Sequence, residues 1–345
     1  MLSYRHPVFL PIRDVILDKG ALHYFCTRST AEIQIESTKE MSQTFRIIPR
    51  EKRARKAVER LSVKEFVAYM DGNFDYLPDL IYKGHQYMSE EAEWAQRISK
   101  ETISYGREQF TCRGFSMYYE KKSFCVRINT PATTKDWQTA LAFIKQLATK
   151  TDATVMTETG KELSLDTIEG YDYKTDILAG IKNLEQVHGS DMQAIAGPCD
   201  RLIYLDETMA QSITTAADPI AAFDTTLEKV FHTDAATPRQ YFIPFRKQDG
   251  SDEFLIGYHI LFTDIPTILP IKPILYQKNV PLIRPRFGGI QKWFIALNIP
   301  GEDPDLFAHE DIIEHLQRCW KIDANQLYVE AMPREEMLEL AKKCE

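Results

Sequence analysis

The sequence Phe-Cys-Val-Arg-Ile-Asn-Thr-Pro at residues 124–131, together with the helical pattern after it, decides the fold of this chain. Phe124, Val126 and Ile128 fall on one face of an extended segment, and Cys125 and Arg127 fall on the other. Apolar residues at helical spacing then run through residues 134–149, and a short strand pattern occupies residues 154–157. The pattern predicts a strand–helix–strand unit, whose second strand we expect to return parallel to the first through a right-handed crossover.

The same pattern occurs again near the C-terminus. Residues 293–300 align with residues 124–131, and both copies reach an Asp-Ala pair 21 or 23 residues after their proline, at Asp152-Ala153 and Asp323-Ala324. In the second copy we predict a helix over residues 310–320 and a strand over 327–330. We expect an internal duplication; the competing interpretation is chance, because strand–helix–strand units are common. Asn129 and Asn298 are expected to end strands, not to form a site.

Other sequence patterns predict further helices and strands, so we expect an α+β fold. Ser62 and Glu65 have the spacing of a capping box, Asp218-Pro219 is a helix start, and residues 115–119 and 123–129 alternate like a hairpin. We predict two halves, at residues 41–190 and 191–345, each a mixed sheet with a hairpin and a strand–helix–strand unit, with a helical middle segment. We expect residues 1–40 to be an extension before a natural start at Met41; the alternative is a strand and loop that pack on the body.

Composition narrows the function classes. The net charge of the 345 residues is −8, which disfavours a general nucleic-acid binder. The six cysteines contain no C-x-x-C pair, so we expect reduced, mostly packed thiols and a cytoplasmic protein. No stretch approaches 18 consecutive apolar residues, so we expect no membrane span.

Residues 50–60 are the strongest charge feature. Six basic and two acidic side chains give this run a charge of +4, and subtracting it from −8 leaves −12 for the rest of the chain. The run could contact RNA, DNA or an acidic protein. No aromatic residue interleaves it, so a base-stacking platform is not indicated. The competing interpretation is a solvated hairpin tip or helix face.

Three motifs resemble chemical sites but lack the necessary spacing or partners. His309 and His315 are six residues apart, whereas two zinc ligands on one helix face need a spacing of four. Residues 284–289 (Arg-Pro-Arg-Phe-Gly-Gly) lack the Lys-Ser/Thr of a phosphate loop, and Cys199 has no accompanying histidine motif. We therefore predict no catalytic residue, no cofactor site and no metal site.

Residues 61–66, 264–273 and 293–297 carry a resemblance that spans most of the chain from Met41. Together they resemble an uncharacterised bacterial family of domains of unknown function. The resemblance implies a bacterial cytosolic protein without an assigned activity, cofactor or set of site residues.

Two function hypotheses remain. The first is a non-catalytic binding or regulatory protein that acts on another macromolecule, with a protein partner favoured over nucleic acid. The second is an enzyme of unknown class whose site lies in a cleft between the two halves, which would require convergent titratable groups in a deep pocket.

Overall fold

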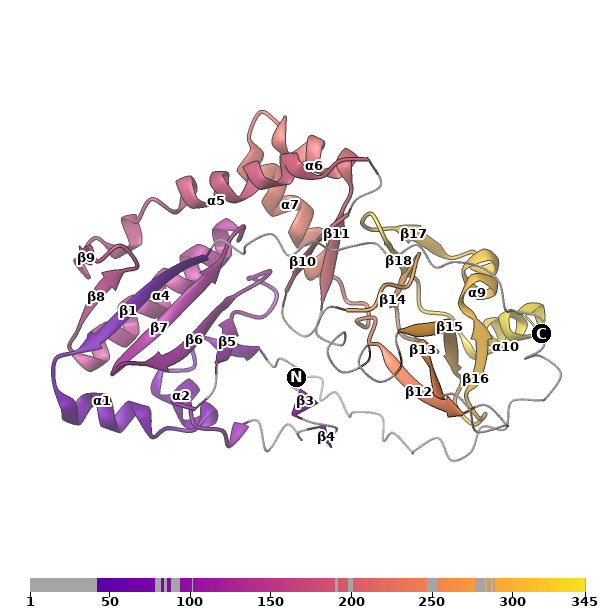
Figure 1. Cartoon of the computed structure of the whole chain (residues 1–345), viewed down its shortest axis with the longest axis horizontal. Helices are drawn as coiled ribbons and strands as arrows, with labels where there is room; N and C mark the ends of the chain where they lie inside the picture. The colour runs from indigo at the N-terminus through magenta and orange to yellow at the C-terminus, as the bar shows by residue number, and fades with distance from the viewer. Residues whose placement is uncertain are drawn as a thin grey trace. The chain divides into compact units, whose positions relative to one another are not determined.

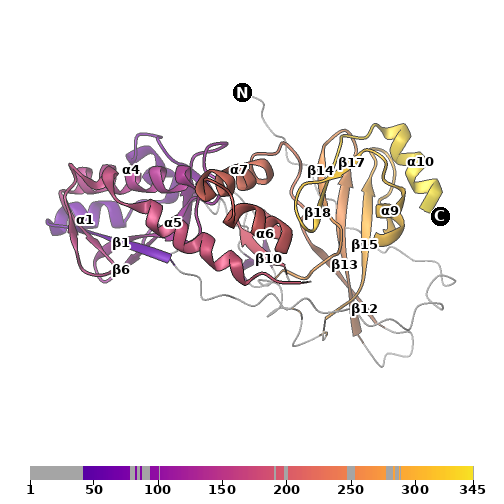
Figure 2. The same ribbon diagram turned by 90° about the horizontal axis from the view of Figure 1, so that it is seen from above.

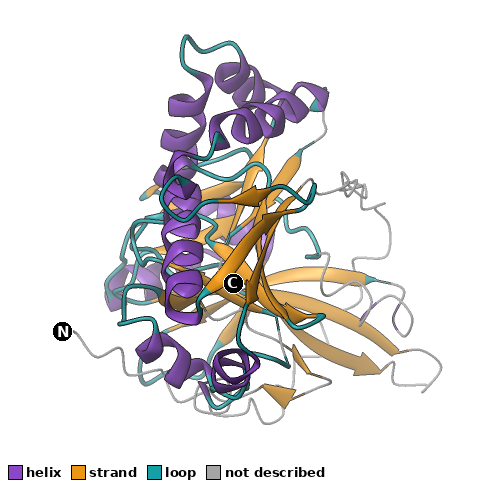
Figure 3. Cartoon of the chain, turned by 90° about the vertical axis from the view of Figure 1, so that its left-hand side faces the viewer, coloured by secondary structure: helices purple, strands orange, loops and turns teal. Residues whose placement is uncertain are grey.

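The chain has an α+β fold, as predicted, with helices and strands in comparable amounts (Figure 3). The computed structural model describes residues 42–77, 82–83, 86–87, 94–100, 102–189, 192–197, 201–246, 253–276, 283, 287 and 289–344. All of them belong to one unit of the chain, Ile35–Glu345. The expected extension at residues 1–40 lies outside the described residues, and the division at residue 190 stays a prediction.

The first half is built on a seven-stranded sheet with the order β2-β5-β6-β7-β1-β8-β9. Each neighbouring pair is antiparallel. The strands are β1 (Ser42–Pro49), β2 (Asp75–Leu77), β5 (Ile103–Gly106), β6 (Phe115–Glu120), β7 (Ser123–Asn129), β8 (Ala153–Thr157) and β9 (Glu162–Leu163). Because β7 and β8 both run antiparallel to β1, they are parallel to each other, which confirms the first strand–helix–strand unit.

Helix α4 (Thr134–Thr151) covers one face of this sheet. Its apolar stripe at helical spacing is buried, as are the inward side chains of β1, β7 and β8. Figure 1 draws β1, β7 and β6 in front of α4, with no helix before them. Burial of this stripe stabilises the first half, because apolar area removed from water contributes roughly 25 cal/mol per Å². The buried members of the stripe are Trp137, Ala140, Leu141, Ile144, Leu147 and Ala148.

Two short helices follow β1. Helix α1 (Lys52–Glu59) is rich in Lys, Arg and Ala, which are good helix formers, and it buries only Val58. Helix α2 (Val63–Tyr69) begins with the predicted capping box, in which the Ser62 side chain accepts from the Glu65 amide and the Glu65 carboxylate accepts from the Ser62 amide. Asp71 and Gly72 follow the end of α2 with positive φ angles.

The middle segment is largely helical, and its buried side chains join the core of the first half. Asp206 and Asp218 cap α6 and α7 through their side chains, and the Asp218-Pro219 start was predicted from the sequence. The elements are η2 (Ile168–Gly170), α5 (Tyr173–Lys182), η3 (Asn183–Gln186), β10 (Gln193–Ala196), β11 (Leu202–Leu205), α6 (Glu207–Thr214) and α7 (Pro219–Phe231).

The C-terminal part contains two further sheets, with the orders β12-β13-β15-β16 and β14-β18-β17. A second apolar cluster joins strands of these sheets to two helices, the first of which lies beside β15 in Figure 2. The elements are β12 (Tyr241–Arg246), β13 (Glu253–Phe262), β14 (Thr267–Pro270), β15 (Ile290–Asn298), β16 (Asp305–Ala308), α9 (His309–His315), β17 (Cys319–Lys321), β18 (Gln326–Val329) and α10 (Arg334–Cys344). A separate pair, β3 (Tyr82–Lys83) and β4 (Gln86–Tyr87), completes the described strands.

The structure does not confirm the internal duplication. In the second copy a strand, β16, separates β15 from the helix, and β15 and β18 belong to different sheets. The predicted helix over residues 310–320 is wrong at its end, because α9 stops at His315 and Cys319–Lys321 form β17. The pairing of Trp320 with Tyr328 across the β17–β18 ladder, with stacked rings, overrides the helical spacing of the apolar residues.

Asp323 ties the strands of the C-terminal part to the middle segment. Its buried carboxylate accepts hydrogen bonds from the amides of Tyr204 (3.0 Å) and Asn325 (2.8 Å), and the Ala324 amide donates to the Tyr204 carbonyl. Burial raises the pKa of Asp323 to about 6 against the opposing effect of these amide donors. The Asp-Ala pair, read in the sequence as a repeat marker, is therefore a packing contact. No helix in the described part of the chain is long and apolar enough to cross a bilayer.

A second buried carboxylate, Asp136, holds the loop before β6 against the start of α4. One oxygen accepts from the amides of Cys112, Arg113 and Gly114 at 2.8–3.0 Å. The other accepts from the amide and hydroxyl of Thr133 at 3.0 and 2.7 Å, which makes a capping box. Gly114 has φ +65°, and a Cβ there would lie 2.3 Å from the Tyr105 carbonyl oxygen, so this loop accepts only glycine.

We expect Asp136→Ala to lower the free energy of unfolding by at least about 3 kcal/mol, because it leaves four backbone amides without an acceptor, three of them buried. Urea unfolding followed by circular dichroism measures the change. Glu65→Ala removes the equivalent carboxylate from the exposed capping box of α2 and should cost less. An equal loss of unfolding free energy in the two variants would contradict the conclusion that the buried hydrogen bonds of Asp136 hold the loop before β6 against α4.

Candidate functional site

The basic run predicted from the sequence forms one surface with the turn between β6 and β7. Helix α1 follows β1 directly, and Ile47 at the end of the β1–β7 ladder pairs with Phe124, next to that turn. We call this the basic surface. Its nine cationic side chains are Arg46, Arg50, Lys52, Arg53, Arg55, Lys56, Arg60, Lys121 and Lys122.

One contact from β6 fixes α1 beside the turn. The Tyr119 hydroxyl hydrogen bonds with the Glu59 carboxylate and lies near Arg55. Partial burial, and then the Glu59 charge, raise the pKa of Tyr119, so the phenol stays protonated and can donate to Glu59. Lys52, Arg53 and Lys56 of α1 are exposed to solvent.

The basic surface is only partly neutralised. Arg50 lies 3.6 Å from Asp152 and Lys121 lies 3.2 Å from Glu120, both as exposed pairs, which contribute little to stability. Within the described residues no carboxylate lies within ion-pair distance of Lys52, Arg53, Lys56, Arg60 or Lys122. With Glu51, Glu59, Glu120 and Asp152 counted, nine positive and four negative groups leave this surface with +5 in a chain of −8.

The open face of the sheet continues the basic surface. Side chains on this face point away from α4 because they alternate with the core residues. Tyr118, Cys125, Arg46 and Met156 lie opposite one another across β6, β7, β1 and β8. The Tyr118 hydroxyl hydrogen bonds with the side chains of Cys125 and Thr44, so this tyrosine is held in place.

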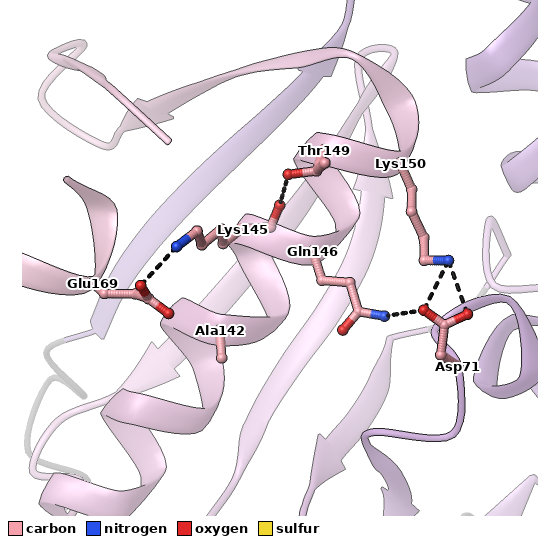
Figure 4. Close-up of a pocket in the computed structure, with 7 residues that line it drawn as sticks. All are labelled: Asp71, Ala142, Lys145, Gln146, Thr149, Lys150 and Glu169. Carbon is pink, nitrogen blue, oxygen red and sulfur yellow. Dashed lines mark hydrogen bonds and ion pairs between the residues drawn. The ribbon is translucent and has the colours of Figure 1, made fainter. Parts of the chain in front are cut away.

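A shallow depression on α4 is a pocket in the described part of the chain (Figure 4). Lys145 pairs with Glu169 at 2.7 Å, and Lys150 and Gln146 reach Asp71 at 3.0 and 3.1 Å. Its charged side chains are thus already engaged with one another, and it belongs to the first half of the chain. It is not the deep cleft between halves that the enzyme hypothesis requires.

Cys112 and His232 are the nearest approach to a nucleophile and base. The Cys112 sulfur lies 3.8 Å from Nε2 of His232, and that nitrogen lies 3.2 Å from the Thr111 carbonyl oxygen. Since a carbonyl only accepts, Nε2 donates to it and has no lone pair for the thiol proton. Burial, and then the charge of Asp136, raise the pKa of the Cys112 thiol. This arrangement holds an unreactive thiol.

His259 and His309 are the most unusual titratable groups in the described part. Their exposed fractions are 0% and 2%, and their rings lie 6.4 Å apart. Nδ1 of His259 donates to the Arg239 carbonyl at 3.0 Å, while His309 hydrogen bonds with the Pro270 backbone. Nε2 of each ring is buried without a hydrogen-bond partner. Burial lowers the pKa values to about 3 and about 4, so both rings are neutral near pH 7.

The motifs set aside in the sequence do not assemble into a site. His309 is buried at the start of α9, whereas His315 is half-buried and binds the Asp311 carbonyl through Nδ1. In the described residues no three His, Cys, Asp or Glu side chains are placed to share a metal ion. Cys199 and most of residues 284–289 lie outside the described residues. The sequence did not identify His259 or Asp136 as notable residues. His259 occurs within an apolar run, and Asp136 occurs in the first turn of a helix.

Alkylation will test whether any described thiol is reactive. We expect iodoacetamide at pH 7.5 to modify the half-buried Cys319 and Cys344 before the buried Cys112 and Cys125. Peptide mass spectrometry of the folded protein measures the order, and the difference should disappear in urea. Rapid labelling of Cys112 in the folded protein would revive the enzyme hypothesis.

Acid should destabilise the protein through the two buried histidines. In the unfolded state the two imidazoles are protonated near pH 6.5, whereas in the folded state they stay neutral to about pH 3–4. The free energy of unfolding that these histidines contribute therefore falls as the pH drops from 6.5 to 4. Urea midpoints across this range measure the loss.

The variant His259→Asn retains a donor for the Arg239 carbonyl and should give a shallower pH dependence than the wild type. The exposed His188→Asn is the matched control. An unchanged slope in His259→Asn would show that this imidazole does not resist protonation.

Comparison with known proteins gives a family without an assigned activity. Residues 42–340 match the model of the domain of unknown function DUF4299, so the chain belongs to that family, as the sequence resemblance indicated. No curated protein and no solved structure gives a significant match.

Proposed function

We propose that this member of the DUF4299 family is a non-catalytic binding or regulatory protein that acts on another macromolecule through the basic surface. The observation that carries the proposal is the charge separation. A surface of +5 stands against −13 for all other residues, obtained by subtracting +5 from −8. A concentrated opposite charge steers an anionic partner to one face and keeps it from the rest of the chain.

The local structure supports a binding role for these side chains. Lys52, Arg53 and Lys56 are exposed on a helix that is anchored near its C-terminal end by Val58 and by the Glu59–Tyr119 contact. A cation held on a rigid element loses less freedom on binding than one on a loose loop. The surface is therefore organised before a partner arrives.

The alternative, an enzyme with its site between the halves, has no comparable support among the described groups. Cys112 is buried with a raised pKa, and the depression on α4 is shallow with its charges paired. Neither arrangement offers a free nucleophile or an unengaged acid and base. We therefore favour binding over catalysis.

Retention on immobilised heparin, a polyanionic probe, tests the basic surface. We expect the wild type to be retained at low salt despite its net negative charge, and Lys52→Glu/Arg53→Glu to elute at markedly lower salt. Acids in the first turn of α1 are favoured by the helix dipole, so this variant should remain folded.

The exposed pair Lys342 and Lys343 on α10 provides a matched control with the same change in net charge. Lys342→Glu/Lys343→Glu should elute close to the wild type. Equal losses in both variants, or a wild type that flows through, would remove the basis of the proposal.

A further inference from the structure

The centre of the basic surface is apolar. Ile48 is 40% exposed, one of four large apolar side chains this exposed in the described residues. It shares the open face of β1 with Arg46, because side chains two apart in a strand point the same way, and Arg50 follows directly after the strand, 3.6 Å from Asp152. An exposed aliphatic side chain next to Arg46 therefore lies four residues before Lys52, the first cation of α1.

This arrangement has the anatomy of a protein interface. Such interfaces place an apolar contact at the centre, are enriched in arginine there, and surround it with a polar rim. Here Ile48 is the centre, Arg46 and Arg50 flank it, and the exposed lysines of α1 and of the β6–β7 turn form the rim. Thr154 and Met156, opposite Ile48 and Arg46 on β8, are half-buried and extend the surface.

Nucleic acid fits the same surface less well. Single strands need exposed aromatic rings for stacking, but Tyr118 and Tyr119 are half-buried, and their hydroxyls are bound to neighbouring side chains. A phosphate chain also carries only negative charge, and Glu51, Glu59, Glu120 and Asp152 would repel it. A protein segment can place a cation or an amide opposite each of these carboxylates.

Resting on the function proposed above, we infer that the partner is an acidic protein segment that seats an aliphatic side chain on Ile48. Its carboxylates contact Arg46, Arg50 and the cations of α1. Arginine is the suitable neighbour, since its planar guanidinium binds carboxylates through two hydrogen bonds while its stem packs on apolar groups. The aliphatic contact adds the selectivity that charge alone lacks.

Three fluorescent probes of twelve units separate the possibilities by anisotropy at 50 and 150 mM NaCl. They are a peptide of alternating Glu and Leu, an all-Glu peptide, and oligo-dT. We expect the Glu-Leu peptide to bind about tenfold tighter than either other probe, since a buried aliphatic side chain is worth about 1.5 kcal/mol or more. Binding should weaken at the higher salt.

Two variants assign the contacts. Ile48→Ser, at an exposed position where folding should be little affected, should remove the preference for the Glu-Leu peptide and leave all-Glu binding within about twofold. Lys52→Glu/Arg53→Glu should weaken both peptides, while Leu178→Ser, another exposed apolar position, should change neither.

Different binding results would contradict the inferred partner and the proposed function. If oligo-dT binds as tightly as the Glu-Leu peptide, or if Ile48→Ser leaves the preference intact, the inferred protein partner is wrong while an anion-binding function stands. If no probe binds at 50 mM NaCl, the inference and the proposed function fail together.

Discussion

The packing of α4 on one face of the seven-stranded sheet is the constraint on which the rest of this structure depends. The apolar stripe of the helix is buried against β1, β7 and β8, and Asp136 secures its first turn to the loop before β6. Because that face is filled, the other face remains open. The end of β1 and helix α1 then present their cations to solvent.

The same packing explains why the buried polar groups are not a site. Asp136 and Asp323 each accept several backbone amide hydrogen bonds, so their charges hold segments of chain together. His232 donates to a carbonyl, and the buried His259 and His309 are neutral near pH 7. The chemistry available to a partner is therefore on the surface, in exposed cations near one exposed isoleucine.

Membership of DUF4299 brings no activity with it, and the described residues offer a binding surface more readily than a catalytic centre. Charge separation of this kind lets an acidic protein present a single attractive face. An apolar contact at its centre would distinguish one acidic partner from another, because electrostatic attraction alone is weakly selective.

The sequence by itself determined the local features. Short-range sequence patterns predict these features, because each depends on residues within a few turns of one another. They are the capping box at Ser62, the cap and proline at Asp218-Pro219, the hairpin of β6 and β7, and the α4 unit. The basic run was also visible as a charge excess over residues 50–60. Local propensity and periodicity are properties of neighbouring residues, so a single sequence reveals them.

Only the tertiary structure shows which segments pack against one another. The second Asp-Ala pair proved to be a buried contact with Tyr204, and Cys319–Lys321 became a strand because Tyr328, eight residues after Trp320, stacks on it across the sheet. Ile48 reads in the sequence as one more apolar residue of a strand. Only the sheet, with α4 on its opposite face, shows that this side chain is exposed among arginines, because which face is covered depends on segments about a hundred residues away.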